Sequence, residues 1–136
     1  MKVSSDDEFL YFYAECASDI TAPEGTNWMN LFINADRSYN TGWYGYNFVL
    51  NRFQNGNEIS VEAFKDSEWA TEKVGTADYC VKGNIIQIKV SKALLGIKDT
   101  FEFKWADNSV ADGDIMKFLD MGDVAPNDRF NYVFKK

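Results

Sequence analysis

Residues 9–16 read Phe-Leu-Tyr-Phe-Tyr-Ala-Glu-Cys, and this stretch is the clearest strand signal in the chain. Aromatic residues fit a pleated sheet well, and side chains along a strand alternate between its two faces. Leu10, Phe12, Ala14 and Cys16 therefore share one face. The alternation predicts a strand that buries this face in a core.

Similar signals recur along the chain with turn residues between them. They predict strands over Trp28–Asn34, Tyr46–Phe53, Ile59–Phe64, Val74–Val81, Ile85–Val90, Thr100–Trp105, Ile115–Leu119 and Arg129–Phe134. Asn55-Gly56 and Lys82-Gly83-Asn84 are typical of tight hairpins, and Ser91–Gly96 is typical of one helical turn. So many short strands with almost no helix predict an all-β fold, an antiparallel β-sandwich. The chain of 136 residues has the length of a single domain over 1–136.

The same alternation predicts which side chains form the core of this sandwich. They are apolar residues that share a strand face with their neighbours two positions away. The predicted core residues are Leu10, Phe12, Met29, Leu31, Ile33, Ile86, Ile88, Val90, Phe101, Phe103 and Trp105.

Composition excludes several classes of function. Acidic residues outnumber basic ones by 21 to 14, and the net charge of −7 argues against nucleic acid and anionic membranes as partners. No stretch approaches the roughly 20 apolar residues that span a membrane.

The chain has no histidine, which excludes His-dependent catalytic relays and the usual mixed zinc sites. Two cysteines, Cys16 and Cys80, are too few for a four-cysteine site; a disulfide between them is left open.

An enzyme of this composition would depend on carboxylates. A glycosidase needs two of them facing each other across a cleft. No spacing among the 21 acidic residues singles out such a pair. We therefore expect a binding domain and not an enzyme.

Aromatic residues make up 16% of the chain, more than a core of this size usually needs. A sugar-binding site needs an aromatic platform flanked by amide and charged groups, because sugar rings present C–H patches ringed by hydroxyls. The candidates for such an aromatic groove are Trp28, Asn30, Trp43, Tyr44, Tyr46, Asn51 and Arg52. The alternative is that the large aromatics pack under a loop, as most do.

Two segments offer side-chain oxygens at close spacing, which suits Ca²⁺. The first supplies Asn34, Asp36 and Asn40, and the second supplies Asp107, Asp112 and Asp114. We expect at least one structural calcium ion there. The alternative is that these residues close turns through contacts with their own backbone.

Several segments together resemble a known family. They are Asn27–Asn34, Thr41–Phe48, Phe103–Asn108, Gly113–Met116, Gly122–Pro126 and Arg129–Tyr132. The pattern is similar to the DOMON-like β-sandwich domains related to family 9 carbohydrate-binding modules. The resemblance implies a non-catalytic, extracellular sugar-binding module appended to a secreted polysaccharide-degrading enzyme, and some relatives carry structural calcium.

These observations combine into one expectation and one alternative. The start of the chain, Met-Lys-Val-Ser-Ser-Asp-Asp-Glu, lacks the apolar region of a signal peptide and leads almost directly into a strand. We therefore expect a domain excised from a longer extracellular protein, which binds oligo- or polysaccharide and targets a catalytic domain of the parent chain to it. The alternative is a structural or protein-interaction spacer domain that binds no sugar.

Overall fold

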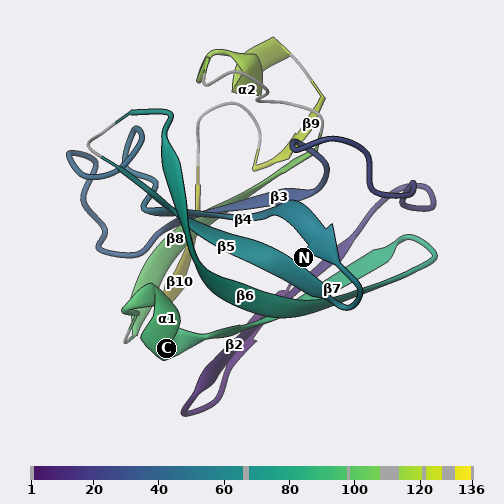
Figure 1. Ribbon diagram of the computed structural model, residues 1–136, viewed down its shortest axis with the longest axis horizontal. Coiled ribbons are helices and arrows are strands. Elements are labelled where there is room, and N and C mark those ends of the chain that lie inside the picture. Colours follow the sequence, from purple (N-terminus) through teal and green to yellow (C-terminus); the bar gives the residue numbers. More distant parts are fainter. Residues whose placement is uncertain are drawn as a thin grey trace.

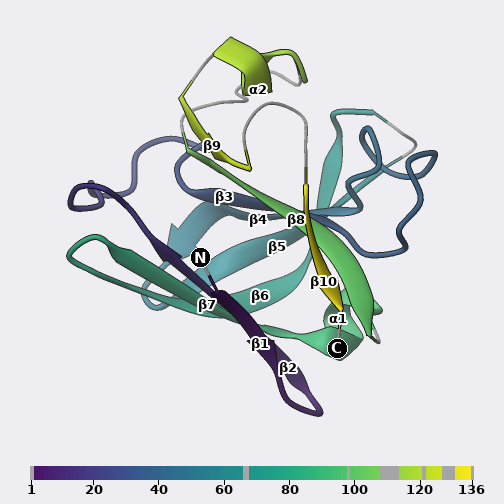
Figure 2. The same ribbon diagram turned by 180° about the vertical axis from the view of Figure 1, so that it is seen from behind.

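The computed structural model describes residues 2–65, 68–97, 99–107, 114–120, 122–126 and 131–135. Strands dominate them, with two short helices (Figures 1 and 2). The strands are β1 (Lys2–Ser5), β2 (Phe9–Glu15), β3 (Asn30–Asn34), β4 (Phe48–Asn55), β5 (Glu58–Phe64), β6 (Thr71–Lys82), β7 (Ile85–Ser91), β8 (Thr100–Asp107), β9 (Asp123–Ala125) and β10 (Tyr132–Lys135). The helices are α1 (Lys92–Leu95) and α2 (Lys117–Asp120).

All strand pairs are antiparallel, and they join into one 10-stranded sheet with the order β1-β2-β7-β6-β5-β4-β3-β8-β10. The remaining strand, β9, also pairs with β8, at residues of β8 that follow those paired with β10. The sheet curls, so that β2 and β7 lie across from β3 and β8 (Figure 1). The predicted all-β, sandwich-like fold is confirmed, with its layers joined by a continuous ladder of hydrogen bonds.

The inner face of the curled sheet encloses the main hydrophobic core. Every predicted core residue is buried in it: Leu10, Phe12, Met29, Leu31, Ile33, Ile86, Ile88, Val90, Phe101, Phe103 and Trp105. Phe12 meets the rings of Phe101 and Phe103 at 5.8 and 5.4 Å, which joins β2 to β8 across the core. We call this buried cluster, which also includes Ala14 and Trp28, the inner core.

A second apolar cluster lies on the outer face of β3, β4, β5 and β8, and we call it the outer cluster. It consists of Phe32, Trp43, Tyr46, Val49, Phe64, Ala106, Ile115 and Phe118. The loop between β3 and β4 covers it from one side, and the segment leading into α2 supplies Ile115. The outer face of this half of the sheet is therefore covered, whereas that of β1, β2, β7 and β6 faces solvent.

The β3–β4 loop reaches the outer cluster through a tight turn. Trp43 and Tyr46 exchange two backbone hydrogen bonds of 2.9 Å, with Tyr44 and Gly45 at positive φ between them. A Cβ at Gly42 would lie 1.9 Å from the carbonyl oxygen of Tyr46, so only glycine fits. The turn buries Trp43 and Tyr46 and leaves Tyr44 exposed.

The helical turn at Ser91–Gly96 is confirmed. The Ser91 hydroxyl accepts the Leu94 N–H as an N-cap, and Gly96 ends the helix in the left-handed conformation. Both predicted hairpins also form, between β4 and β5 and between β6 and β7.

The strand predicted over Ile115–Leu119 is wrong, because this segment turns into α2. Asp114 starts the turn: its side chain accepts the Met116 N–H at 3.0 Å and its carbonyl accepts the Lys117 N–H at 3.0 Å. Ile115 and Phe118 are buried and three positions apart, which is helical spacing.

Strand boundaries differ from the predictions elsewhere. Strand β1 was not predicted at all. The terminal strand starts at Tyr132, and the first residues of the predicted range Arg129–Phe134 lie outside the described residues. No helix in the described part of the chain has the length and apolar character needed to cross a membrane.

Candidate functional site

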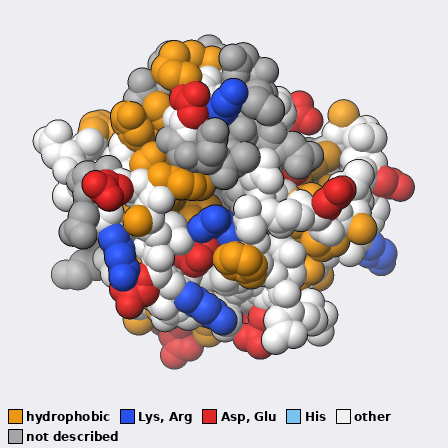
Figure 3. Space-filling view, turned by 45° about the horizontal axis from the view of Figure 1, so that its top comes forward, with side chains coloured by type: hydrophobic (Ala, Val, Ile, Leu, Met, Phe, Trp, Pro, Cys, Tyr) orange, Lys and Arg blue, Asp and Glu red, His pale blue; other side chains and the backbone are white. Residues whose placement is uncertain are grey.

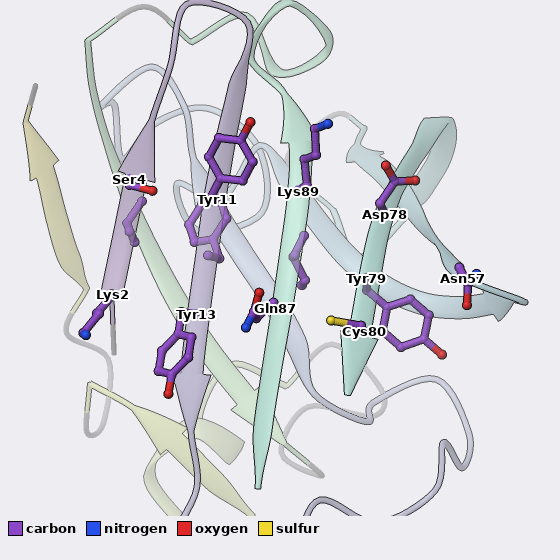
Figure 4. Close-up of a pocket in the computed structure, with 13 residues that line it drawn as sticks. Lys2, Ser4, Tyr11, Tyr13, Asn57, Asp78, Tyr79, Cys80, Gln87 and Lys89 are labelled. Carbon is purple, nitrogen blue, oxygen red and sulfur yellow. The ribbon is translucent and has the colours of Figure 1, made fainter. Parts of the chain in front are cut away.

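The outer face of β1, β2, β7 and β6 carries a shallow hollow of about 1030 Å³ (Figure 4). We call this surface the tyrosine face. Its outward-pointing residues are Lys2, Ser4, Tyr11, Tyr13, Asp78, Cys80, Gln87 and Lys89. Figure 4 shows Tyr11 and Tyr13 one above the other on β2, with polar side chains on the neighbouring strands.

Strand register arranges these residues in two rows across the sheet. One row runs through Ser4, Tyr11, Lys89 and Asp78, and the other runs through Lys2, Tyr13, Gln87 and Cys80. Directly opposite side chains in antiparallel strands have Cβ atoms about 4.5–5.5 Å apart. Each tyrosine therefore has a polar or charged neighbour on both sides.

Tyr11 is held in place by an acidic turn at the start of β2. Its hydroxyl donates a hydrogen bond of 2.6 Å to Asp6 Oδ2, while Asp6 Oδ1 accepts the backbone N–H groups of Glu8 and Phe9. The hydrogen bond from Tyr11, followed by those two, lowers the pKa of Asp6 to about 2. The same bond raises the pKa of Tyr11.

This contact gives a pH-dependent prediction. The lowered pKa of Asp6 means that its contribution to stability is present above about pH 4 and disappears as the pH falls toward 2. We expect the variant Asp6→Asn to melt below the wild type at pH 7 and much closer to it at pH 2, where about half of the Asp6 carboxyls are protonated. Thermal melts of both proteins at the two pH values measure this. An equal difference at both values would show that the Asp6 carboxylate is not involved.

Two ammonium groups lie over aromatic rings on this face. Lys89 Nζ is 4.1 Å from the ring centroid of Phe9, and Lys2 Nζ is 5.7 Å from that of Tyr13. The face thus combines ring surfaces for apolar contact with hydrogen-bond donors and acceptors. This is the combination that holds a sugar ring, whose C–H groups stack on an aromatic plane and whose hydroxyls need polar partners.

The structure does not bring together the residues predicted to form an aromatic groove. Trp28 is 2% exposed in the inner core, and Trp43 is 2% exposed in the outer cluster, on the opposite face of the sheet. Met29, with a φ of 42°, interrupts the strand alternation. Trp28 therefore packs on the inner side, where its ring meets that of Tyr79.

Asn30 and Asn51, predicted to contact sugar, are buried and hold the backbone. The Asn30 amide donates to the carbonyl of Asn51 at 3.0 Å, and the Asn51 amide donates to the carbonyls of Trp28 and Met29 at 3.3 and 3.1 Å. Gln54 donates to Asn51 Oδ1 at 2.8 Å. These hydrogen bonds connect the segment just before β3 with the bulge in β4.

Arg52 is also engaged within the fold. Its Nη1 lies 3.6 Å from Glu62 Oε2 and donates to Thr71 Oγ1 at 3.0 Å. Its guanidinium carbon lies 5.8 and 5.6 Å from the ring centroids of Phe53 and Trp69.

Tyr44 and Tyr46 lie near each other, away from the tyrosine face. Tyr46 is buried and donates a hydrogen bond of 2.5 Å to Asn131 Oδ1, whereas Tyr44 is 55% exposed. Both line a hollow of about 250 Å³ with Tyr39, Ile115 and Asn131. Tyr39 donates its hydroxyl to the buried carboxylate of Glu102, which also accepts from Arg37 and Asn131.

The first predicted calcium segment uses its side chains within the loop. Asp36 accepts the Ser38 N–H with one carboxylate oxygen and the Thr41 hydroxyl with the other. Asn34 donates to the Ser38 carbonyl, and its buried Oδ1 has no hydrogen-bond partner in the described structure. Asn40 donates its backbone N–H to Ser38 Oγ.

In the second calcium segment, Asp107 Oδ1 accepts the Met29 N–H and Asp114 Oδ1 accepts the Met116 N–H. Asp112 lies outside the described residues. The described residues contain no group of three acidic, cysteine or histidine side chains placed to hold a metal ion. Calcium binding at either segment stays a prediction of the sequence.

Cys16 and Cys80 are both free thiols. Cys16 lies next to β2, where burial raises the pKa of its thiol, and Cys80 is exposed on the tyrosine face. The disulfide that the sequence left open is therefore not formed.

The residues of the tyrosine face were missed in the sequence because only the apolar side of residues 9–16 was considered. The other side carries Phe9, Tyr11, Tyr13 and Glu15, so three aromatics recur at every second position. The core needs only the apolar side of this strand. Aromatic residues on the other side therefore indicate a surface that binds something. No protein-family model, curated protein or solved structure matches the chain.

Proposed function

We propose that this protein is a non-catalytic domain that binds oligo- or polysaccharide on its tyrosine face. The observation that carries the proposal is the pair Tyr11 and Tyr13, side by side on a solvent-facing strand and flanked by polar side chains on both neighbouring strands. Sugars use ring faces and polar rims together, because their C–H patches stack on aromatic planes and their hydroxyls need polar partners. We further propose, from the resemblance, that the domain serves a secreted polysaccharide-degrading enzyme.

The expected affinity is modest. The tyrosine face is an open surface, so a bound chain stays partly in water and only a few contacts contribute. Dissociation constants between millimolar and micromolar correspond to about −4 to −8 kcal/mol. Two stacked rings with a few hydrogen bonds supply this range after the cost of ordering the ligand.

The test is retention of the protein by polysaccharides, measured as retardation on gels that contain cellulose, xylan, mannan, galactan or pectin. We expect the wild type to be retarded by at least one of them. Tyr11→Ala and Tyr13→Ala should each weaken that binding about tenfold, and the double variant should abolish it, because each removes one ring surface. Tyr132→Ala, an exposed tyrosine on β10, is the matched control and should bind as the wild type does.

Two other outcomes would contradict the proposal. Binding that survives in the Tyr11/Tyr13 double variant but is lost in Tyr44→Ala would move the site to the hollow beside Tyr39. Absence of binding to every polysaccharide would favour the spacer domain. Thermal melts must show that every variant is folded at the temperature of the binding assay. Tyr13→Ala should melt with the wild type, whereas Tyr11→Ala should melt somewhat lower because it also loses the hydrogen bond to Asp6.

A further inference from the structure

The charge of the side chains that line the hollow of the tyrosine face differs in sign from that of the whole chain. The residues that line its hollow include Lys2 and Lys89 but a single carboxylate, Asp78. The chain as a whole carries a net charge of −7. On the face of the molecule shown in Figure 3, acidic and basic side chains are interspersed. The lining of the hollow thus carries two ammonium groups and one carboxylate, with the carboxylates of Asp6 and Glu15 at the hydroxyl ends of Tyr11 and Tyr13.

The two lysines are not used up by ion pairs within the fold. Ion pairs in the described part of the chain join Arg37 to Glu102, Arg52 to Glu62 and Lys65 to Glu72. Within that part, no carboxylate oxygen lies within 4.0 Å of Lys2 Nζ or Lys89 Nζ. Asp78 is opposite Lys89 in the strand register and still lies beyond this distance.

Each lysine stands beside one of the two tyrosines. Lys2 is opposite Tyr13 on the β1 side, and Lys89 is opposite Tyr11 on the β7 side. The Phe9 ring lies under the Lys89 ammonium group at 4.1 Å and holds it at this face. A sugar ring stacked on either tyrosine therefore has an ammonium group at its rim, on opposite sides of β2.

An ammonium group binds a carboxylate more strongly than a hydroxyl, because the hydrogen bond is assisted by charge. We propose that the tyrosine face prefers polysaccharides that carry carboxylates on their sugar rings, that is, polyuronates, with Lys2 and Lys89 as the carboxylate partners. This inference rests on the proposed sugar-binding function and specifies its ligand class. The acidic groups that face this surface are Asp78 opposite Lys89, Glu58 beyond it, Asp6 at the Tyr11 hydroxyl and Glu15, which accepts from the Tyr13 hydroxyl at 3.5 Å; they disfavour carboxylates at those edges.

The experiment compares polygalacturonate with its methyl ester, which has the same sugar rings without the charge, and includes alginate as a second polyuronate. We expect the wild type to bind polygalacturonate at least tenfold more tightly than the ester in low salt. This preference should shrink as salt is raised, because both lysines face solvent. The double variant Lys2→Gln/Lys89→Gln should bind the acid and the ester equally well. Lys135→Gln, on β10 at the other end of the sheet, is the matched control and should keep the preference.

The possible results separate this inference from the proposed function. Equal binding of acid and ester by the wild type, binding of neutral polysaccharides alone, or a preference that persists in Lys2→Gln/Lys89→Gln overturns the inference and leaves sugar binding standing. Failure to bind any polysaccharide, charged or neutral, overturns the proposed function itself.

Discussion

Replacing Trp28 by alanine is expected to lower the free energy of unfolding by about 3–5 kcal/mol, as truncation of a buried tryptophan does. Trp28 is 2% exposed in the inner core and its ring packs against that of Tyr79. Trp43→Ala should cost a similar amount, because that ring is equally buried and contacts Phe32, Phe64 and Trp69. Urea unfolding of both variants measures these losses.

Phe53→Ala is the matched control for these two variants. Phe53 is a large aromatic side chain that is 55% exposed, and its loss should change stability by less than about 0.5 kcal/mol. Under conditions where Trp28→Ala and Trp43→Ala remain folded, both should still bind polysaccharide, because neither ring belongs to the tyrosine face. Loss of binding with unchanged stability would instead place the sugar at the tryptophans, as the sequence predicted.

The second large effect is expected at Asn51. Asn51→Ala should lower the free energy of unfolding by about 3 kcal/mol for two reasons. It removes the amide that satisfies the buried carbonyl of Met29, which costs about 1–3 kcal/mol. It also places alanine at a φ of 74°, where a Cβ is strained. Alanine has no side-chain hydrogen bonds to offset this strain, which costs roughly 1–2 kcal/mol.

A glycine at the same position separates the two causes. Asn51→Gly loses the same hydrogen bonds but adopts positive φ without strain. It should therefore be less destabilised than Asn51→Ala by about 1 kcal/mol in urea unfolding. Equal stability of Asn51→Ala and the wild type would show that the amide does not hold the β3 entry, and would return Asn51 to the list of candidate sugar contacts.

The fold could be predicted from the sequence because its strands alternate cleanly. In β2, β7 and β8 every second side chain is apolar, and each of these residues is buried in the inner core. The prediction was wrong where the backbone leaves the strand conformation. A positive φ at Met29 turns Trp28 from the expected outer side to the inner one, and no residue type in that stretch signals it.

The candidate site was harder to predict because large aromatics and amides have two uses. Asn30 and Asn51 have the side chains that a sugar site needs, but those groups also satisfy buried backbone carbonyls when the chain bulges. Trp28 and Trp43 were predicted to bind sugar because tryptophan offers a large ring for stacking. The same large ring also makes tryptophan a good core residue. Tyr11 and Tyr13 alternate with the core residues Leu10, Phe12 and Ala14, so the sequence distinguishes them less clearly as candidates for binding.

Strand β2 alternates between inner core and tyrosine face without a break: Leu10, Phe12 and Ala14 point inward, and Tyr11 and Tyr13 point outward. The proposed ligand platform is therefore the outward side of a strand whose inward side is buried in the inner core. The backbone that carries Tyr11 and Tyr13 is therefore already fixed by the core, which lowers the entropy cost of binding at the proposed site. The outward residues are also free to vary without disturbing the inward ones, which gives this surface room to change its ligand specificity during evolution while the fold stays intact.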